Sequence, residues 1–593
     1  MRRQGTTLGA FVALACLAGC GGGSSRGGGA STAAPLTTGA GFALLATAPL
    51  DGEQGVDPDA TLYATFSGEV DPTSLAPGAL LLSSDVGPVD ATLSIVGSAV
   101  VAARPVSPLA PDTNHLLRVT TAVRSLAGET LPAEVLVRFR TGLRRVSAPP
   151  PGTTPPTSRS AGPYEAGAAS VDVTPPVGVP LAGYGGGARR RPFPDLDPFD
   201  FHTFLEPSTG IHDPILAKAL VLGNGHERVA ILTLDAIACD ADVLEEACRK
   251  ARAQGFTVPL EKVLACASHS HSGPGALSRR TFWQLTAADL RVQRVVDGFT
   301  DGMARALVEA ERALGPAAIG LASTQVVGAT ENRRADDSPD LDKDDIDPEL
   351  IAIRIDRPNG TPVATVWSFA VHGTHFGTRD HLYSADIMGA ASIKAQAAGA
   401  GLALFLNGAE ADLRPTGTYD GTGQLIADAI LAARAAARTE AQGVLTTAHE
   451  VVDLGQPYID WSPRRNGLSS AIANAGWVQA LTSLGIGLHV RLDLPAGWVE
   501  RQFRFQGLRL GGSVIASLPG EPIHALGLEL KRDGRALGYE HVIPACLANG
   551  YGSYFTTPAE YGYGGYEGLA SFFGPDNGQK LLAPARRLMQ TVR

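Results

Sequence analysis

The second part of the chain, residues 164–593, alternates short apolar runs with longer segments whose apolar positions recur at helical spacing. The helical pattern is clearest in "ADVLEEACRKARAQG" (241–255), "VVDGFTDGMARALVEAERALG" (295–315) and "GQLIADAILAARAAARTEA" (423–441). The apolar runs between such segments are rich in Val, Ile, Leu and Ala, which is typical of buried strands. This alternation predicts an α/β domain, and no internal repeat is evident in the sequence.

Residues 46–142 follow a different pattern, with short strand-like runs in close succession and turn residues between them. The runs are "TLYATFS" (61–67), "ALLLSS" (79–84), "TLSIVGSAVVAA" (92–103), "HLLRVTTAV" (115–123) and "EVLVRFRTG" (134–142). Such spacing predicts an all-β sandwich, and the segment resembles bacterial Ig-like domains, for which a spacer role is the default. Residues 143–163, rich in Pro, Thr and Ser, are expected to be an extended linker between this sandwich and a domain at 164–593.

The first residues have the features of an export signal. Arg2 and Arg3 precede an apolar run, residues 8–17, that is about half as long as a membrane-spanning helix. The run ends in Leu17-Ala18-Gly19-Cys20, which resembles the bacterial lipobox. We therefore expect a lipoprotein signal peptide at 1–19, lipidation of Cys20 and a flexible Gly/Ser tether at 20–45. The protein would then be anchored in the bacterial cell envelope, with the outer membrane favoured and its face open; the alternative is an ordinary secretory signal with a chance cysteine.

Charge and cysteine content exclude several classes of function. The net charge of −10 argues against a nucleic-acid partner, because phosphate binding needs concentrated Lys and Arg. The one basic run, Arg189-Arg190-Arg191, is expected to be a solvated loop. The cysteines after the tether, Cys239, Cys248, Cys266 and Cys546, form no Cys-x-x-Cys pair, so they are expected to be buried free thiols.

Polar clusters follow five of the predicted strands. They are Ser268-His269-Ser270-His271, His372-Gly373-Thr374-His375, Asn407 to Asp412, Pro519-Gly520-Glu521-Pro522 and Asn549 to Tyr554. Ligands of open α/β sheets lie beyond the carboxyl ends of the strands, so these clusters are expected to form one site. Two histidines and a carboxylate are the ligands of a catalytic zinc ion that keeps one position open for water. Each histidine taken alone is more often a structural residue.

Several motifs of this region, taken in order, resemble those of the neutral ceramidases, and more closely the broader bacterial branch of that superfamily. The motifs are "SVDVTPPVGVPLAGYG" (170–185), "GIHDPILAKALVL" (210–222), "ASHSHSGPG" (267–275), "NRR" (332–334), "FAVHGTHFG" (369–377), "LFLNGAEADLRP" (404–415), "LPGEP" (518–522) and "NGYGSYFTTPAEYGYGGYE" (549–567). Neutral ceramidases are zinc-dependent amidases that split ceramide into sphingosine and a fatty acid. The resemblance implies the same fold and a Zn²⁺ cofactor for residues 164–593.

The resemblance also implies roles for single residues. The zinc ligands would be His269, His372, Glu521 and Tyr554. His271 would exchange protons with the water and the leaving amine. Arg333 and Tyr566 would hold the substrate or the oxyanion, while His375, Asp386 and Asp412 would orient the ligands by hydrogen bonds or have no role beyond loop polarity.

One position departs from the family pattern. Ceramidases carry a Gly-Asp-x-Ser-Pro segment with an important serine, and here Ala411-Asp412-Leu413-Arg414-Pro415 places arginine at that position. A permanently charged Arg414 facing the metal could reject an apolar ceramide headgroup or bind an anionic one. The sequence therefore predicts a zinc-dependent amidase for ceramide or a related N-acyl lipid. The alternatives are a metal hydrolase for another amide or ester and a non-catalytic surface protein that binds lipid or glycan; acyl-chain preference and oligomeric state stay open.

Overall fold

The computed structural model describes residues 41–593 apart from 142–158, 461–490 and the single positions 50, 57, 59, 97, 198, 337 and 339. The expected signal peptide, Cys20, nearly all of the expected tether and most of the expected linker lie outside the described residues. Among the helices that are described, none combines the length and the apolar character needed to cross a bilayer.

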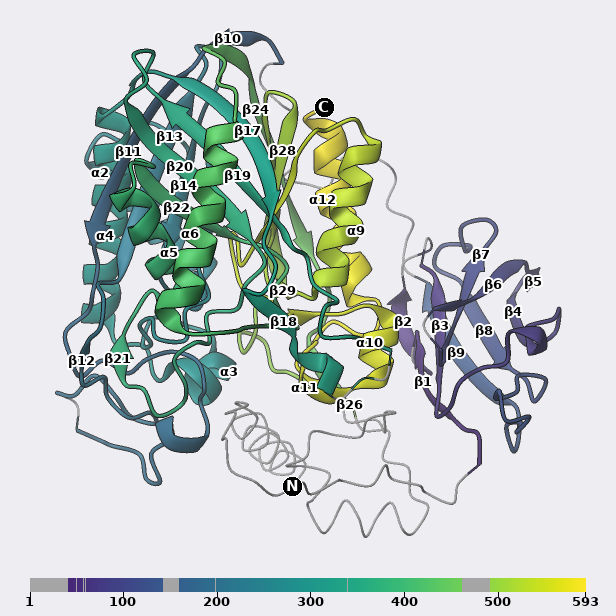
Figure 1. Ribbon diagram of the computed structural model, residues 1–593. Helices are drawn as coiled ribbons and strands as arrows, with labels where there is room; N and C mark the ends of the chain where they lie inside the picture. Colours follow the sequence, from purple (N-terminus) through teal and green to yellow (C-terminus); the bar gives the residue numbers. More distant parts are fainter. Residues whose placement is uncertain are drawn as a thin grey trace.

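Residues Leu44 to Thr141 form a sandwich of two sheets (Figure 1). One sheet has the order β1 (Leu44–Ala48), β3 (Leu62–Phe66), β7 (Val100–Pro105) and β6 (Ala91–Val96). The other has the order β2 (Glu53–Val56), β9 (Val135–Thr141), β8 (Asn114–Val119), β4 (Leu80–Ser84) and β5 (Gly87–Val89). The apolar run 92–103 is not one strand but the hairpin β6–β7. Side chains of both sheets, such as Phe66 and Phe139, share one buried cluster.

The α/β domain contains three copies of one supersecondary unit, each a β-β-β-α-β-α series. The first consists of β11 (Glu165–Asp172), β13 (Leu216–Gly223), β14 (Arg228–Leu234), α2 (Ala241–Ala253), β15 (Val263–Ala267) and α4 (Gln293–Arg312). The second consists of β17 (Ala318–Gln325), β19 (Glu349–Asp356), β20 (Pro362–Phe369), α5 (Asp386–Ala397), β22 (Leu402–Asn407) and α6 (Tyr419–Ala436). The third consists of β24 (Gln442–Asp453), β27 (Gln502–Leu510), β28 (Ser513–Leu518), α9 (His524–Ala536), β30 (Val542–Cys546) and α12 (Asn577–Thr591).

Each unit forms one sheet in which the strands lie in chain order, and the short strands β10 (Ala161–Pro163) and β16 (Gly315–Pro316) extend two of the sheets at an edge. The first strands of each sheet pair antiparallel, and the last pair is parallel: β14 with β15, β20 with β22, and β28 with β30. A parallel pair requires a crossover, which α2, α5 and α9 supply. The repeat is thus one of topology, which the sequence does not reveal.

The three sheets face one another around a shared apolar core, and a helix pair covers the outer face of each sheet (Figure 1). The pairs are α2 with α4, α5 with α6, and α9 with α12. The core joins side chains from all three sheets, for example Ile231, Ile353 and Ile515. The strands β15, β22 and β30 lie beside one another in the interior, so their carboxyl ends open at one common place.

The sandwich contacts the α/β domain through α10 (Pro558–Tyr563). Ala559 packs against Tyr63 and Val100 on the outer face of the β1-β3-β7-β6 sheet. Gly562 lies so close to Thr65 that a Cβ atom there would be 2.6 Å from the threonine methyl group. The two domains are therefore packed against each other in addition to being joined by the linker.

Candidate metal centre

The polar clusters that follow β15, β20, β22, β28 and β30 converge at one end of the α/β domain, as the sequence predicted. His269 comes after β15, His372 after β20, and Glu521 lies in the short strand β29 (Glu521–Pro522), beyond β28. Strand β29 pairs in parallel with β31 (Tyr554–Phe555), so Glu521 and Tyr554 are direct partners across the two strands. Each of the three repeated units thus contributes to the same site.

The backbone at these strand ends is unusual. His269, Asn549 and Ser553 have φ angles of 65°, 63° and 68°, a region that side chains other than Gly rarely adopt. Gly373 follows His372 and packs on the His269 carbonyl group, which a Cβ atom at position 373 would approach to 2.4 Å. Strained residues and a close approach that only Gly allows are typical of positions where geometry is required for function.

The rings of His269, His271 and His372 point their Nε2 atoms toward one another. The His271 Nε2 atom lies 3.4 Å from Nε2 of His269 and 3.3 Å from Nε2 of His372. His269 Nδ1 is 2.8 Å from the Ile237 carbonyl oxygen, which can only accept, so in the neutral ring Nδ1 donates and Nε2 carries a lone pair. Burial lowers the pKa values of His271 and His372, and the neighbouring His269 ring adds to this effect, so both are neutral imidazoles at neutral pH.

A cation fits between these acceptor atoms. In the neutral ring, the lone pair on His269 Nε2 faces the Glu521 Oε2 atom at 3.1 Å, so only a cation shared by the two atoms, a proton or a metal ion, makes this contact favourable. Suitable ligand atoms of His269, His372, Glu410 and Glu521 all lie within 4.8 Å of one another. Buried imidazoles and carboxylates are the donors that a first-row divalent metal ion prefers, so the residues present fit such an ion.

Two tyrosines lie against Glu521. Tyr551 donates a hydrogen bond to Glu521 Oε1, and the hydroxyl group of Tyr554 interacts with the same carboxylate. Burial alone would raise the pKa of Glu521, but His269 and the two hydroxyl groups hold it below its ordinary value. Glu521 is therefore ionised at neutral pH and can serve as an anionic ligand.

Glu410, which follows β22, belongs to the donor group but was not among the site residues predicted from the sequence. Its side chain has no exposed surface, and burial together with Glu521 raises its pKa well above the ordinary value. The position belongs to the polar cluster Asn407 to Asp412, so its place after a strand was a usable signal. The family motif, however, indicates Asp412 and Arg414 as the positions of interest in this segment.

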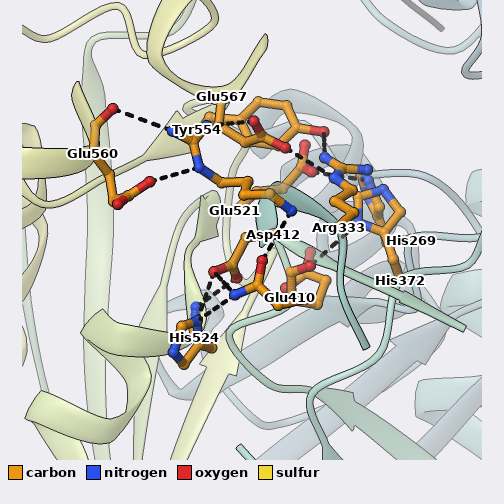
Figure 2. Close-up of polar contacts among 12 residues, drawn as sticks. His269, Arg333, His372, Glu410, Asp412, Glu521, His524, Tyr554, Glu560 and Glu567 are labelled. Carbon is orange, nitrogen blue, oxygen red and sulfur yellow. Dashed lines mark hydrogen bonds and ion pairs between the residues drawn. The ribbon is translucent and has the colours of Figure 1, made fainter. Parts of the chain in front are cut away.

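Arg333 and Arg334 form a network of ion pairs with Glu560 and Glu567, and Figure 2 shows Arg333 beside His269 and His372. Arg333 donates to Glu567 at 2.8 Å and to the Tyr554 hydroxyl group at 3.4 Å. Arg334 donates to Glu560 at 2.7 Å and to the second oxygen of Glu567 at 2.5 Å. The network holds Arg333 between Tyr554 and the ring of Tyr566, which lies 5.2 Å from the Tyr554 ring in an edge-to-face arrangement.

The three residues expected to orient ligands lie around the site without entering the donor group. Asp386 accepts the backbone N–H groups of His375 at 3.1 Å and Phe376 at 3.4 Å, which fixes the loop after His372. The His375 ring is half-buried and lies against Phe376 and Tyr419. Asp412 accepts from Nδ1 of His524 at 2.6 Å, and its carbonyl oxygen accepts the Arg333 N–H group.

The prediction that Arg189-Arg190-Arg191 forms a solvated loop is wrong for Arg189, which is 1% exposed. Its guanidinium group donates to the carbonyl oxygens of Ala182, His271 and Asp380. These carbonyl groups belong to three separate segments, and the buried arginine provides each of them with a hydrogen bond. The four cysteines, by contrast, are buried and free, as predicted.

A cavity of about 700 Å³ opens onto the donor group. Its apolar lining includes Ile237, Leu277, Trp283, Phe299 and Phe572. Its polar lining includes Arg333, Asp336, His375 and Arg414. The Arg414 guanidinium group lies 2.6 Å from Glu331 and 2.9 Å from Asp336, so two carboxylates balance its charge.

Comparisons with known proteins agree with this architecture. The family model "Neutral/alkaline non-lysosomal ceramidase, N-terminal" matches residues 195–403 and 479–582, just over half of the chain, and the model "Bacterial Ig-like domain" matches residues 40–141. The neutral ceramidase of Mycobacterium tuberculosis is 25% identical over 451 residues, 62% of this chain and 70% of that protein. The neutral ceramidase of Pseudomonas aeruginosa is 24% identical over 453 residues, 63% of this chain and 66% of that protein.

The crystal structure of the Pseudomonas aeruginosa neutral ceramidase superposes with a TM-score of 0.59, covering 72% of this chain and 75% of that one at 21% identity. This likeness shows the fold. The predicted fold class, an α/β catalytic domain of the neutral ceramidase type with a separate N-terminal Ig-like sandwich, is confirmed. This chain spans about two thirds of the length of the two curated relatives.

Proposed function

Because this chain belongs to the neutral/alkaline non-lysosomal ceramidase family, whose model matches just over half of it, we propose that it is a zinc-dependent amidase. Its substrate would be ceramide or a related N-acyl lipid, which it would cleave to a fatty acid and an amine. The observation that carries the proposal is the meeting of His269, His372 and Glu521 in one cavity, with a lone pair of His269 facing the carboxylate at 3.1 Å.

We propose that His269, His372, Glu521 and Tyr554 hold the metal ion. Two imidazoles, a carboxylate and a phenol oxygen are donors that zinc accepts, and Glu521 and Tyr554 already contact each other. Bound there, zinc would supply a Lewis acid that polarises an amide carbonyl group and lowers the pKa of a water molecule. Arg333 and Tyr566 line the cavity beside these residues, where their donor groups can hold the negative charge that develops on the carbonyl oxygen.

His271 would transfer a proton from the water molecule to the leaving amine. Its ring lines the cavity, and the Tyr184 ring, 4.4 Å away between centroids, covers one side of it. Gly183 permits this position, because a Cβ atom there would lie 2.4 Å from the His271 Nδ1 atom. A neutral imidazole in this place can accept a proton from water and pass it to the leaving amine.

We expect His271→Gln to keep the metal ion and to lower kcat by about 10²- to 10⁴-fold, the usual contribution of a positioned acid or base. Gly183→Ala should also lower kcat, because the added Cβ atom would displace the His271 ring. Metal content is measured beside kcat, since His271 Nε2 lies within 3.4 Å of both proposed histidine ligands. Loss of the metal from His271→Gln would make His271 a ligand and contradict its role as proton carrier.

The mixed lining of the cavity supports a substrate with an apolar acyl chain and a polar group at the amine. The aromatic and aliphatic side chains of the lining suit a hydrocarbon chain, and Arg333 and Asp336 suit hydroxyl groups. Arg414 in the lining favours a second candidate, a hydrolase for N-acyl amides whose amine part is more polar than sphingosine.

A substrate panel tests the proposal against this second candidate. The protein is incubated with ceramide, with N-acyl amino acids and with an ester of matched acyl chain, and the products are identified by mass spectrometry. Release of sphingosine with the highest kcat/KM supports ceramide. Preference for N-acyl amino acids supports the more polar amide, and cleavage of the ester alone would contradict the amidase proposal.

We also propose that the protein is anchored in the bacterial cell envelope through lipidated Cys20, as its N-terminal sequence indicates. An anchored enzyme would meet lipid amides at the membrane. In the native host, we expect Cys20→Ser to move the protein from the membrane fraction to the soluble fraction. Equal membrane association of the two forms would contradict the anchor.

A further inference from the structure

Glu410 is a buried carboxyl group near the proposed metal ligands that forms no ion pair with a described side chain. Its side chain has no exposed surface, and within the described part of the chain neither carboxylate oxygen has a hydrogen-bond partner. A buried ionised carboxylate without partners is expensive, and native proteins retain one where it is paired or binds a metal ion. Glu410 can therefore be ionised only with a cation beside it, and no described cationic side chain bonds to it.

The other buried carboxylates of the site have their own cations. Glu560 and Glu567 bind the two guanidinium groups of the network, at 2.7 Å to Arg334 and 2.8 Å to Arg333. Asp412 is paired with His524 at 2.6 Å, and this contact raises the pKa of the imidazole against the effect of burial. Arg333 also attracts Glu410 electrostatically, but its guanidinium group is bonded to Glu567. Glu410 and Glu521 are left as two neighbouring buried carboxyl groups that share no cationic side chain of their own.

The position of Glu410 indicates how it acts. One of its carboxylate oxygens belongs to the same group as the ligand atoms of His269, His372 and Glu521, all within 4.8 Å of one another, and Figure 2 shows these residues together. Yet Glu410, unlike the other three, is absent from the residues that line the cavity. It therefore faces the donor group from the protein side, where it can reach a metal ion but not a substrate.

We propose that Glu410 is a further ligand of the metal ion, so that two histidines, two carboxylates and Tyr554 would hold it. The inference rests on the proposed function, because it concerns the same metal ion. Two carboxylates neutralise a divalent cation, which explains how two buried anions can be retained side by side. A second carboxylate also adds an oxygen ligand. Compared with a site that has one carboxylate, such a site favours harder first-row cations.

Zinc affinity and the stabilisation of the protein by zinc test the proposal. Metal-free full-length protein is titrated with Zn²⁺ in competition with a chelator of known affinity, and the visible spectrum is recorded with Co²⁺. We expect Glu410→Gln to weaken zinc binding by about 100-fold or more, beyond the usual effect of residues behind the ligands. The Co²⁺ spectrum should change, because a directly bound oxygen is lost.

The rise in melting temperature on adding Zn²⁺ should be smaller for Glu410→Gln than for the wild type, because the variant binds the ion more weakly. The matched control is Glu450→Gln, which neutralises a buried glutamate of β24 whose partner Arg587 is half exposed, and it should bind zinc like the wild type.

Unchanged zinc affinity in Glu410→Gln, or weaker binding with an unchanged Co²⁺ spectrum, would overturn the ligand role. An equal rise in melting temperature with Zn²⁺ in the variant and in the wild type would do the same. These outcomes differ from failure of the proposed function, in which the wild-type protein itself binds no zinc.

Discussion

Replacing His269 by alanine is expected to remove the bound metal ion and to lower amide hydrolysis by more than about 10³-fold. The loss exceeds that of a single oxyanion donor, because both the polarised carbonyl group and the activated water depend on the metal ion. Glu521→Ala should have the same effect, since its carboxylate faces the lone pair of His269 at 3.1 Å. Metal content by mass spectrometry and initial rates check both variants.

His226→Ala and Glu540→Gln are the matched controls, since both residues are exposed and lie away from the site. They should keep the zinc content and the rate of the wild type. Full zinc content in either His269→Ala or Glu521→Ala would show that the residue is not a ligand. Full activity in a variant without metal would contradict the metal-dependent mechanism as a whole.

Replacing Arg334 by methionine is expected to lower the unfolding free energy of the α/β domain by about 3–5 kcal/mol, the usual effect of removing one partner from a buried ion pair. The variant leaves Glu560 and Glu567 without the guanidinium group that binds them at 2.7 Å and 2.5 Å. Urea denaturation followed by tryptophan fluorescence measures the change. All five tryptophans lie at or beyond position 283, so the signal reports on the α/β domain alone.

Arg249→Met provides the comparison, because Arg249 is exposed and pairs with Glu246 on the surface of α2. Its expected effect is below about 1 kcal/mol, as for surface ion pairs generally. An equal effect of the two substitutions would mean that the Arg334 network does not stabilise the wall of the site. Arg334→Met should also lower activity at temperatures where it is folded, since Glu567 holds Arg333 as well.

The location of the site could be predicted from the sequence because strand ends are visible as changes from apolar to polar residues. His269, His372 and Glu521 each follow an apolar run that is a strand, so their meeting followed from the rule for α/β sheets. The ligand role of Tyr554 came only from the family resemblance, and the structure adds its contact with Glu521. That role, like those of His271, Arg333 and Tyr566, stays a prediction.

Other features could not be predicted because they depend on contacts between distant segments. The threefold repeat leaves no trace in the sequence, since a buried strand needs only apolar side chains and not particular ones. Arg189 looked solvated because its acceptors are backbone carbonyl groups of other loops. Glu410 looked like one polar residue among several, and its lack of a partner is visible only in three dimensions.

The measurement that tests the central claim most directly is the release of sphingosine from ceramide by zinc-loaded protein that begins at Gly21, with and without a zinc chelator. We expect sphingosine release that stops with the chelator and returns when Zn²⁺ is added in excess. Release that is insensitive to the chelator would contradict a metal-dependent mechanism. No release from protein shown to contain zinc would contradict ceramide as the substrate.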